Sequence, residues 1–140
     1  MSDGIGNKIA HPLKEQPKGA RQHVNAGPYS PVLEVDARRL VVISGQVAVN
    51  FDGDIIGDTI EEQTIATLRN CAGLLDSAGC SLADVFKVNI YLSDLGSWDR
   101  FNSIYEEHMP EPLPVRTAVQ AILLPGFLVE IEMWATKAGS

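Results

Sequence analysis

The sequence predicts an α+β fold, in which a mixed sheet of five or six strands carries two helices on one face. Two observations lead to this prediction. Apolar residues recur at helical spacing in only two segments, and the other apolar runs are short, rich in β-branched residues and bounded by turn residues. A length of 140 residues fits one domain. We expect this domain to span residues 24–140, after a flexible lead-in over the polar residues 1–23.

The elements are expected in the order β-β-α-β-α-β-β. Two extended segments come first, over residues 32–35 and 40–50. A capping box opens the first helix, because the Thr59 hydroxyl can accept from the Glu62 amide while the Glu62 side chain reaches back. Gly79 suits the left-handed position that ends this helix. A strand, a second helix with Ser97 as its N-cap and two further strands follow, over residues 85–94, 97–108, 115–122 and 127–136.

Side-chain alternation indicates that one face of the sheet stays uncovered. In the last strand Ile131 points to one face, while Glu130 and Glu132 point to the other. We place Arg116 of the preceding strand on the same face as the two glutamates. Since two helices can cover only one face of such a sheet, the second face calls for another subunit, and identical subunits usually assemble with closed symmetry. The sequence therefore predicts a homo-oligomer.

The charge balance argues against two classes of partner. The chain has 11 basic and 18 acidic residues, a formal net charge of −7, which disfavours binding to nucleic acid or to an anionic membrane. No apolar run is long enough for a membrane span and no signal peptide is visible, so a cytoplasmic location is expected. The cysteines and histidines do not have the spacing of metal ligands, so no metal site is expected. Between Arg100 and Lys137 the only basic residue is Arg116.

A set of short motifs, in a fixed order, resembles the Rid (reactive intermediate deaminase, or YjgF) family. The resemblance extends over about residues 24–136, and it rests on Gly27-Pro28-Tyr29-Ser30, Ser44-Gly45-Gln46, Asn102-Ser103-Ile104-Tyr105-Glu106, Pro114-Val115-Arg116, and Leu124-Pro125-Gly126 followed by Glu130-Ile131-Glu132. It implies a chorismate-mutase-like subunit and a homotrimer with active sites in clefts between subunits. It also implies hydrolysis of enamine or imine intermediates, such as 2-aminoacrylate in its 2-iminopropionate form, to a 2-keto acid and ammonia. The implied partner is a small imino acid, and no cofactor is implied.

The resemblance also assigns the two catalytic residues. Arg116 falls on the arginine that binds the substrate carboxylate, a role suited to a planar guanidinium, which can donate two parallel hydrogen bonds. Glu130 falls on the acid that holds the attacking water, and a carboxylate in a partly dry cleft can also transfer protons. The alternative for both residues is a structural ion pair, of Arg116 with Glu130 or with Glu132.

Five further residues are expected to line the substrate site by the same resemblance. Tyr29 would form a wall, Ser44 and Gly45 would allow a close backbone approach, and Asn102 would project from the second helix. Each has a structural alternative: a packed turn for Tyr29, a tight sheet crossing for the Ser44-Gly45 pair and an exposed helical position for Asn102. Ala118 stands where many family members have a cysteine. It can keep backbone contacts to the substrate nitrogen but excludes thiol chemistry at this position.

Two other functions compete with imine hydrolysis. A non-catalytic protein that binds or senses small acids would use the same cleft and the same Arg116, but it would not need a residue that positions water. A ribonuclease or translation-inhibitor activity, which has been attached to some relatives, is disfavoured here by the acidic composition and the lack of a basic patch.

Overall fold

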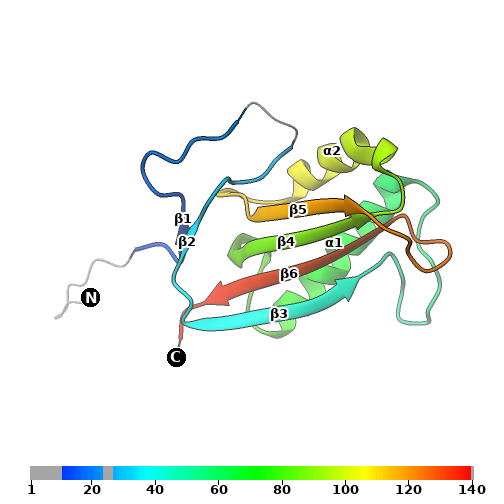
Figure 1. Ribbon diagram of the computed structural model, residues 1–140. Coiled ribbons are helices and arrows are strands. Elements are labelled where there is room, and N and C mark those ends of the chain that lie inside the picture. The colour runs from blue at the N-terminus through cyan, green and yellow to red at the C-terminus, as the bar shows by residue number, and fades with distance from the viewer. Residues whose placement is uncertain (1–10, 24–26, 140) are drawn as a thin grey trace.

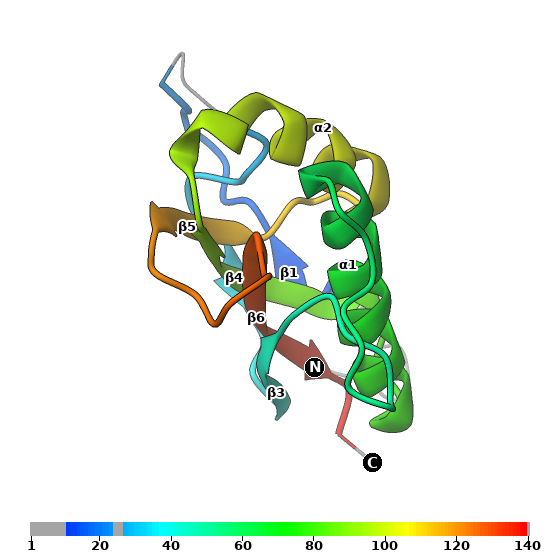
Figure 2. The same cartoon turned by 90° about the vertical axis from the view of Figure 1, so that its right-hand side faces the viewer.

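The computed structural model describes residues 11–23 and 27–139, and it shows a sheet with both helices on one side (Figures 1 and 2). The strand order in the four-stranded sheet is β3-β6-β4-β5. A separate two-stranded sheet pairs β1 with β2. The bounds of the elements are β1 Lys14–Glu15, β2 Glu34–Val35, β3 Arg39–Gln46, α1 Ile60–Ser77, β4 Val85–Leu92, α2 Trp98–His108, β5 Val115–Gln120 and β6 Val129–Lys137.

The two predicted helices are confirmed, with a difference at the start of α2. α1 begins after Thr59, whose capping box with Glu62 is present, and Gly79 beyond its end has a φ of +79°. Ser97 makes no side-chain cap to α2. Instead the carboxylate of Asp94 accepts from the Gly96 amide at 2.8 Å and opens a short 3-10 turn that runs into α2. Because the Asp94 carboxylate caps this 3-10 turn and the turn continues into α2, the helix begins from a preformed turn rather than from a serine cap.

The sheet is mixed, as predicted, but the strands do not form one sheet of five or six. β6 pairs antiparallel with β3 and β4, while β5 pairs parallel with β4. Among the described residues, the extended segment at Glu34–Val35 pairs with β1 and not with the four-stranded sheet. Around residue 36 the chain turns, and the Asp36 amide donates to the carbonyl of Leu13 at 2.7 Å. This turn separates β2 from β3, so β2 belongs to the small sheet.

The hydrophobic core fills the space between the helices and one face of the sheet. β4 and β6 contribute alternate residues and the helices contribute one stripe each, as their sequence periodicity predicts. The fully buried side chains of this core include Val88, Ile90, Leu92, Val129, Ile131, Met133, Leu75, Phe101 and Tyr105. On the opposite face of the sheet, the described part of the chain places no helix (Figure 2).

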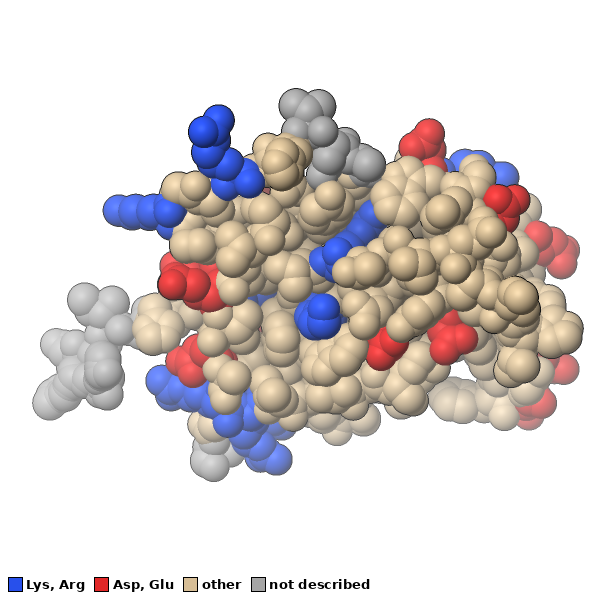
Figure 3. Space-filling model, viewed as in Figure 1, with Lys and Arg blue, Asp and Glu red and all other residues tan. Residues whose placement is uncertain are grey.

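The uncovered face carries apolar side chains that a single chain leaves in water. Leu40 and Val42 of β3 are 53% and 57% exposed, and Val119 of β5 is 42% exposed. Figure 3 shows this face: its centre is mostly uncharged, with a few basic and acidic groups among the uncharged side chains. Exposed apolar side chains gathered on one sheet face are typical of an interaction surface.

Part of the expected lead-in packs on the domain. Within residues 1–23, β1 lies at Lys14–Glu15 and pairs with β2, and Lys14 is only 6% exposed. Residues 1–10 lie outside the described residues. Pairing with a distant segment has no local pattern in the sequence, so the sequence alone does not indicate that β1 packs on the domain. No helix within residues 11–23 and 27–139 is long and apolar enough to cross a membrane.

A buried glutamine of α1 ties two loops to the helix. The Gln63 side-chain amide donates to the carbonyls of Gly57 and Gly126 at 3.1 and 2.9 Å. Its oxygen accepts from the Leu128 amide at 2.8 Å. Gly57 and Gly126 have φ angles of +96° and +90°, a backbone region that favours glycine. Gln63, itself 1% exposed, thus joins the loop before α1 to the loop before β6.

We expect Gln63→Met to lower the free energy of unfolding by about 2–4 kcal/mol, because it removes the hydrogen-bond partner of three part-buried backbone groups. Urea unfolding measures this change. Arg69→Met is the matched control, since it puts the same residue at an exposed position of α1 and should stay within about 0.5 kcal/mol of the parent. Equal stability of the two variants would contradict the structural role of Gln63.

Candidate active site

Arg116 lies on the covered face of the sheet, next to α2, and not on the open face that the sequence predicted. In the parallel pair of β4 and β5, Arg116 is the partner of Val88, which is fully buried. The two side chains therefore point to the same side of the sheet. The prediction was wrong because each face of β5 mixes polar and apolar residues, so this strand alone does not identify its inner face.

Four aromatic rings surround the Arg116 guanidinium. Its Cζ atom lies 4.9, 5.4, 5.6 and 5.8 Å from the ring centroids of Tyr105, Trp98, Tyr29 and Phe101, respectively. Three of these residues belong to α2 and are spaced by three and four positions, so the helix presents them on one face. Ring faces within about 6 Å attract a cation, which offsets part of the cost of desolvation. Burial nevertheless lowers the pKa of Arg116.

Within the described residues, one nitrogen of the Arg116 guanidinium has a hydrogen-bond partner and another has none. Arg116 Nη2 donates to Asn102 Oδ1 at 2.7 Å, and a Cβ added at Gly27 would come within 2.7 Å of the same nitrogen. Arg116 Nη1 is buried and has no hydrogen-bond partner among residues 11–23 and 27–139. A buried donor without a partner costs about 1–3 kcal/mol. This nitrogen is therefore suited to an acceptor that a ligand supplies.

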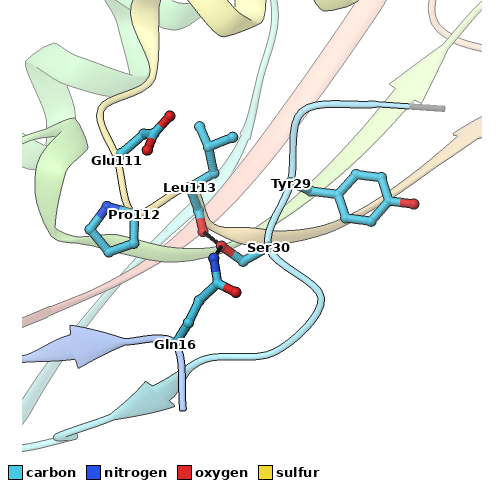
Figure 4. A pocket seen from close by; sticks show the side chains of 6 residues that line it. All are labelled: Gln16, Tyr29, Ser30, Glu111, Pro112 and Leu113. Atoms are coloured by element: carbon cyan, nitrogen blue, oxygen red, sulfur yellow. Dashed lines mark hydrogen bonds between the residues drawn. The ribbon is translucent and has the colours of Figure 1, made fainter. Parts of the chain in front are cut away.

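Tyr29 reaches the guanidinium from a turn that Ser30 holds in place. The Ser30 amide donates to the Pro114 carbonyl at 3.2 Å, and its hydroxyl donates to the Leu113 carbonyl at 2.5 Å. A cavity of about 450 Å³ adjoins this turn and is lined by Gln16, Tyr29, Ser30, Glu111, Pro112 and Leu113 (Figure 4). In that view the Tyr29 ring points away from the Gln16 and Leu113 side chains. The ring therefore belongs to the surroundings of Arg116 more than to the cavity.

Glu130 lies on the open face of the sheet. Its cross-strand partner is Tyr91 of β4, and the neighbouring pair, Ile131 with Ile90, is buried on the covered side. The Tyr91 hydroxyl donates diagonally to Glu132 Oε1 at 2.5 Å, and this hydrogen bond is the main reason why the pKa of Tyr91 is raised. Glu132 thus has a partner on this face, and that partner is not Arg116.

Ser44 and Gly45 lie next to Glu130 at an irregularity of the sheet. The register between β3 and β6 shifts between Ile43 and Gln46, so the two residues form a bulge. A Cβ added at Gly45 would overlap the Glu130 carboxylate. The lack of a side chain at residue 45 therefore makes room for this carboxylate, as expected for a position that allows close approach.

Within one chain, Arg116 and Glu130 do not form one site. β5 and β6 lie on either side of β4, which separates them by about 10 Å. Their partners on β4, Val88 and Tyr91, lie three residues apart, which adds about 10 Å along the strands. The side chains also point to opposite faces, and the described residues contain no ion pair of Arg116 with Glu130 or Glu132.

The predicted site residues therefore fall into two groups. Tyr29 and Asn102 lie with Arg116 near the covered face, and Ala118, the partner of Ile90, lies on that face as well. Ser44, Gly45 and Glu130 form the second group on or beside the open face.

Three residues that contact Arg116 were not assigned a functional role from the sequence. Phe101 and Tyr105 were identified only as the buried face of the second helix, and Trp98 was not singled out. A signal was present, since aromatic residues at helical spacing precede the only basic residue of an acidic stretch. No group of three or more His, Cys, Asp or Glu side chains that could hold a metal ion occurs among the residues that the structure describes.

Comparisons with known proteins agree on one family. Residues 20–137 match the family model described as endoribonuclease L-PSP. The protein mmf2, mitochondrial, of Schizosaccharomyces pombe is 41% identical over 115 residues, which is 79% of this chain and 89% of the relative. The 2-iminobutanoate/2-iminopropanoate deaminase of Mus musculus is 35% identical over 113 residues, 79% of this chain and 82% of that protein. The crystal structure of yeast Mmf1 has a TM-score of 0.68 at 29% identity and covers 81% of this chain and 93% of its own.

We expect Arg116→Met to raise the free energy of unfolding by about 1 kcal/mol. The substitution removes a buried charge, one of whose donors has no partner among the described residues, and leaves an apolar side chain among aromatic rings. Chemical unfolding measures the change. Arg100→Met is the control: Arg100 forms an exposed ion pair with Glu61 at 2.7 Å, so its loss should cost less than about 1 kcal/mol. A marked loss of stability in Arg116→Met would instead identify Arg116 as a structural residue.

Proposed function

The chain belongs to the endoribonuclease L-PSP family, also called the YjgF or Rid family, and from this premise we propose that it hydrolyses imino acids. The proposed substrate class includes 2-iminopropionate, the imine form of 2-aminoacrylate. In the reaction, the water oxygen forms a bond to C2 of the imine and the carbon–nitrogen bond breaks. The nitrogen leaves as ammonia with the protons of the water, and a 2-keto acid remains. The name of the mouse relative supports this substrate class.

The observation that carries the proposal is the buried Nη1 of Arg116, which has no hydrogen-bond partner in the part of the chain that the structure describes. A carboxylate oxygen would supply the acceptor that this donor lacks, in a charge-assisted hydrogen bond of about 1.5–3 kcal/mol. Asn102 occupies Nη2 and fixes the plane of the guanidinium. The ring of Tyr29 forms one wall beside it. In this proposal Asn102 positions Arg116 and does not itself bind the substrate.

Glu130 is the proposed holder of the attacking water. A carboxylate can orient a water molecule, accept its proton and pass a proton to the departing nitrogen. Gly45 leaves room beside this carboxylate, and Ser44 lies in the same bulge, where backbone groups can come close to the imine. Ala118 offers only backbone contacts, so the proposed reaction needs no thiol.

The two groups of residues meet in the proposed homotrimer. Since one chain holds Arg116 and Glu130 on opposite faces of its sheet, a complete site needs the Arg116 group of one copy and the Glu130 group of another. The uncovered sheet face, where Leu40 and Val42 are more than half exposed, supports assembly through that face. The cytoplasm remains the proposed location, although the Schizosaccharomyces pombe relative is named mitochondrial.

Two alternative functions differ from imine hydrolysis in the residues or the surface that they require. A protein that only binds small acids needs Arg116 but not Glu130, so the glutamate separates it from a hydrolase. The family model bears an endoribonuclease name, yet a ribonuclease needs a basic surface for the phosphate backbone, and this chain has a net charge of −7.

We expect the protein to accelerate ammonia release when a pyridoxal-phosphate enzyme generates 2-aminoacrylate. Glu130→Gln should lower kcat by about 100-fold or more, because the amide cannot accept the proton of the water. Arg116→Lys should lower kcat/KM by a similar factor, mainly through KM, since an ammonium does not replace the directed donors of the guanidinium. Coupled assays of ammonia and 2-keto acid formation measure both effects.

Glu132→Gln is the matched control for the glutamate, since it lies on the same face two residues away. The amide oxygen of glutamine can still accept from Tyr91, so kcat should stay within about threefold of the parent. No acceleration across several imino acids would contradict the enzyme proposal. Activity that survives Arg116→Lys unchanged would contradict the assigned carboxylate site.

We expect a solution mass of about three times the chain mass of 15.2 kDa. The sheet face that one chain leaves in water should be buried in such an assembly. Sedimentation equilibrium measures the mass. Val42→Glu places a charge on the uncovered face and should shift the mass toward that of one chain, with loss of turnover. A fully active single chain would overturn the shared site.

A further inference from the structure

The N-terminal segment that packs on the domain begins before residue 20, where the match to the family model starts. The family model starts at residue 20, whereas β1 lies at Lys14–Glu15 and pairs with β2. The carbonyl of Leu13 also accepts from the Asp36 amide at 2.7 Å. These contacts therefore lie outside the residues that the family model matches.

Lys14 is the most deeply buried charged residue of this segment. It is 6% exposed, and its ammonium donates to the Val85 and Pro112 carbonyls at 2.5 and 2.8 Å. A buried ammonium is tolerated only where hydrogen bonds replace water. Burial lowers the pKa of Lys14 to about 8, against the opposing effect of Asp84 nearby. At pH 7 the side chain is therefore still mainly an ammonium that binds two carbonyls.

The segment that precedes β5 is held in place by hydrogen bonds that its backbone carbonyls accept. Residues 110, 112 and 114 are prolines, which have no backbone N–H to donate. Three consecutive carbonyls, of Pro112, Leu113 and Pro114, instead accept from Lys14 Nζ, the Ser30 hydroxyl and the Ser30 amide. Arg116 follows two residues later, so these bonds fix where its strand begins.

The same N-terminal segment also supports the turn that carries Tyr29. Gln22 Nε2 donates to the Tyr29 carbonyl at 2.9 Å, and Gln16 Nε2 donates to the Ser30 hydroxyl at 3.4 Å. Figure 4 shows Gln16 directed toward Ser30 and the Leu113 carbonyl. The segment thus contacts both structures that flank the guanidinium, the Tyr29 turn and the entry to β5.

We propose that an N-terminal brace, formed by Leu13, Lys14, Gln16 and Gln22, holds Arg116 and Tyr29 in the geometry that binds a carboxylate. Lys14 is its central positioning residue. Lys14 touches neither substrate nor reacting atoms and acts through the Pro112 carbonyl. The brace rests on the proposed function in one respect, namely that the ligand of Arg116 is a carboxylate. Its effect is on the affinity for that carboxylate and not on the step that breaks the carbon–nitrogen bond.

Lys14→Met tests the brace, because it keeps an apolar side chain of similar length and removes the two hydrogen bonds. We expect KM for the imino acid to rise about tenfold with kcat within twofold of the parent. The Kd for pyruvate, followed by the NMR shift of the Trp98 indole N–H, should rise by the same factor. Lys18→Met is the control, since Lys18 is exposed on the same segment, and should change neither constant.

The outcomes separate the brace from the proposed reaction. A weaker pyruvate affinity in Lys14→Met but not in Lys18→Met supports the brace, even if no variant hydrolyses imines. The absence of imine hydrolysis would reject only the proposed reaction. If Lys14→Met is less stable but its KM and Kd are unchanged, the brace is overturned and Lys14 is a structural residue. Failure of the parent protein to bind pyruvate would also overturn the brace. Should Lys14→Met not fold, Gln22→Leu, which alters an exposed side chain, decides by the same criterion.

Discussion

The parallel pairing of β5 with β4 is the constraint on which the candidate site depends. Two parallel strands in one sheet need a connection that crosses back over the sheet, and α2 is part of that connection. The register opposite Val88 then brings Arg116 next to the aromatic face of the helix. Burial of a guanidinium is costly, and here the rings and the Asn102 oxygen offset part of that cost. Among the described residues Nη1 has no acceptor, so the same packing arrangement that buries the guanidinium leaves one donor directed to the proposed anion.

The same sheet separates the residues that the proposed chemistry requires. Arg116 lies on the side that the helices cover and Glu130 lies on the side that they leave open. No rotamer change brings the two together, because the β4 backbone and its side chains lie between them. Burial of the open face against another copy would meet two needs at once: it removes Leu40 and Val42 from water, and it supplies the missing half of the site. Under the proposed arrangement, the same contact between copies therefore drives assembly and completes the site.

Features that depend on local sequence patterns were predicted correctly, whereas features that depend on pairing between distant segments were not. The capping box at Thr59, the left-handed Gly79 and the alternation of β6 are all local, and all three were found. The face of Arg116 was wrong because both faces of β5 are mixed in polarity, and only the register with β4 resolves them. Lys14 bonds to a carbonyl 71 residues away, for which the sequence has no local signal. The group formed by Tyr29, Asn102 and Arg116 was predicted from the family resemblance, whereas its position relative to Glu130 required the fold.

The placement of Arg116 and Glu130 on opposite faces has a consequence for genetics. In the proposed trimer each site takes one group from each of two chains, so a chain that lacks the arginine still carries an intact glutamate. A chain that lacks the glutamate likewise keeps its arginine. When both kinds of chain are made in one cell, mixed assemblies contain some interfaces at which the two intact halves meet. Two alleles that are each inactive alone would then complement one another, as alleles do when the unit of function is the contact between copies and not the chain.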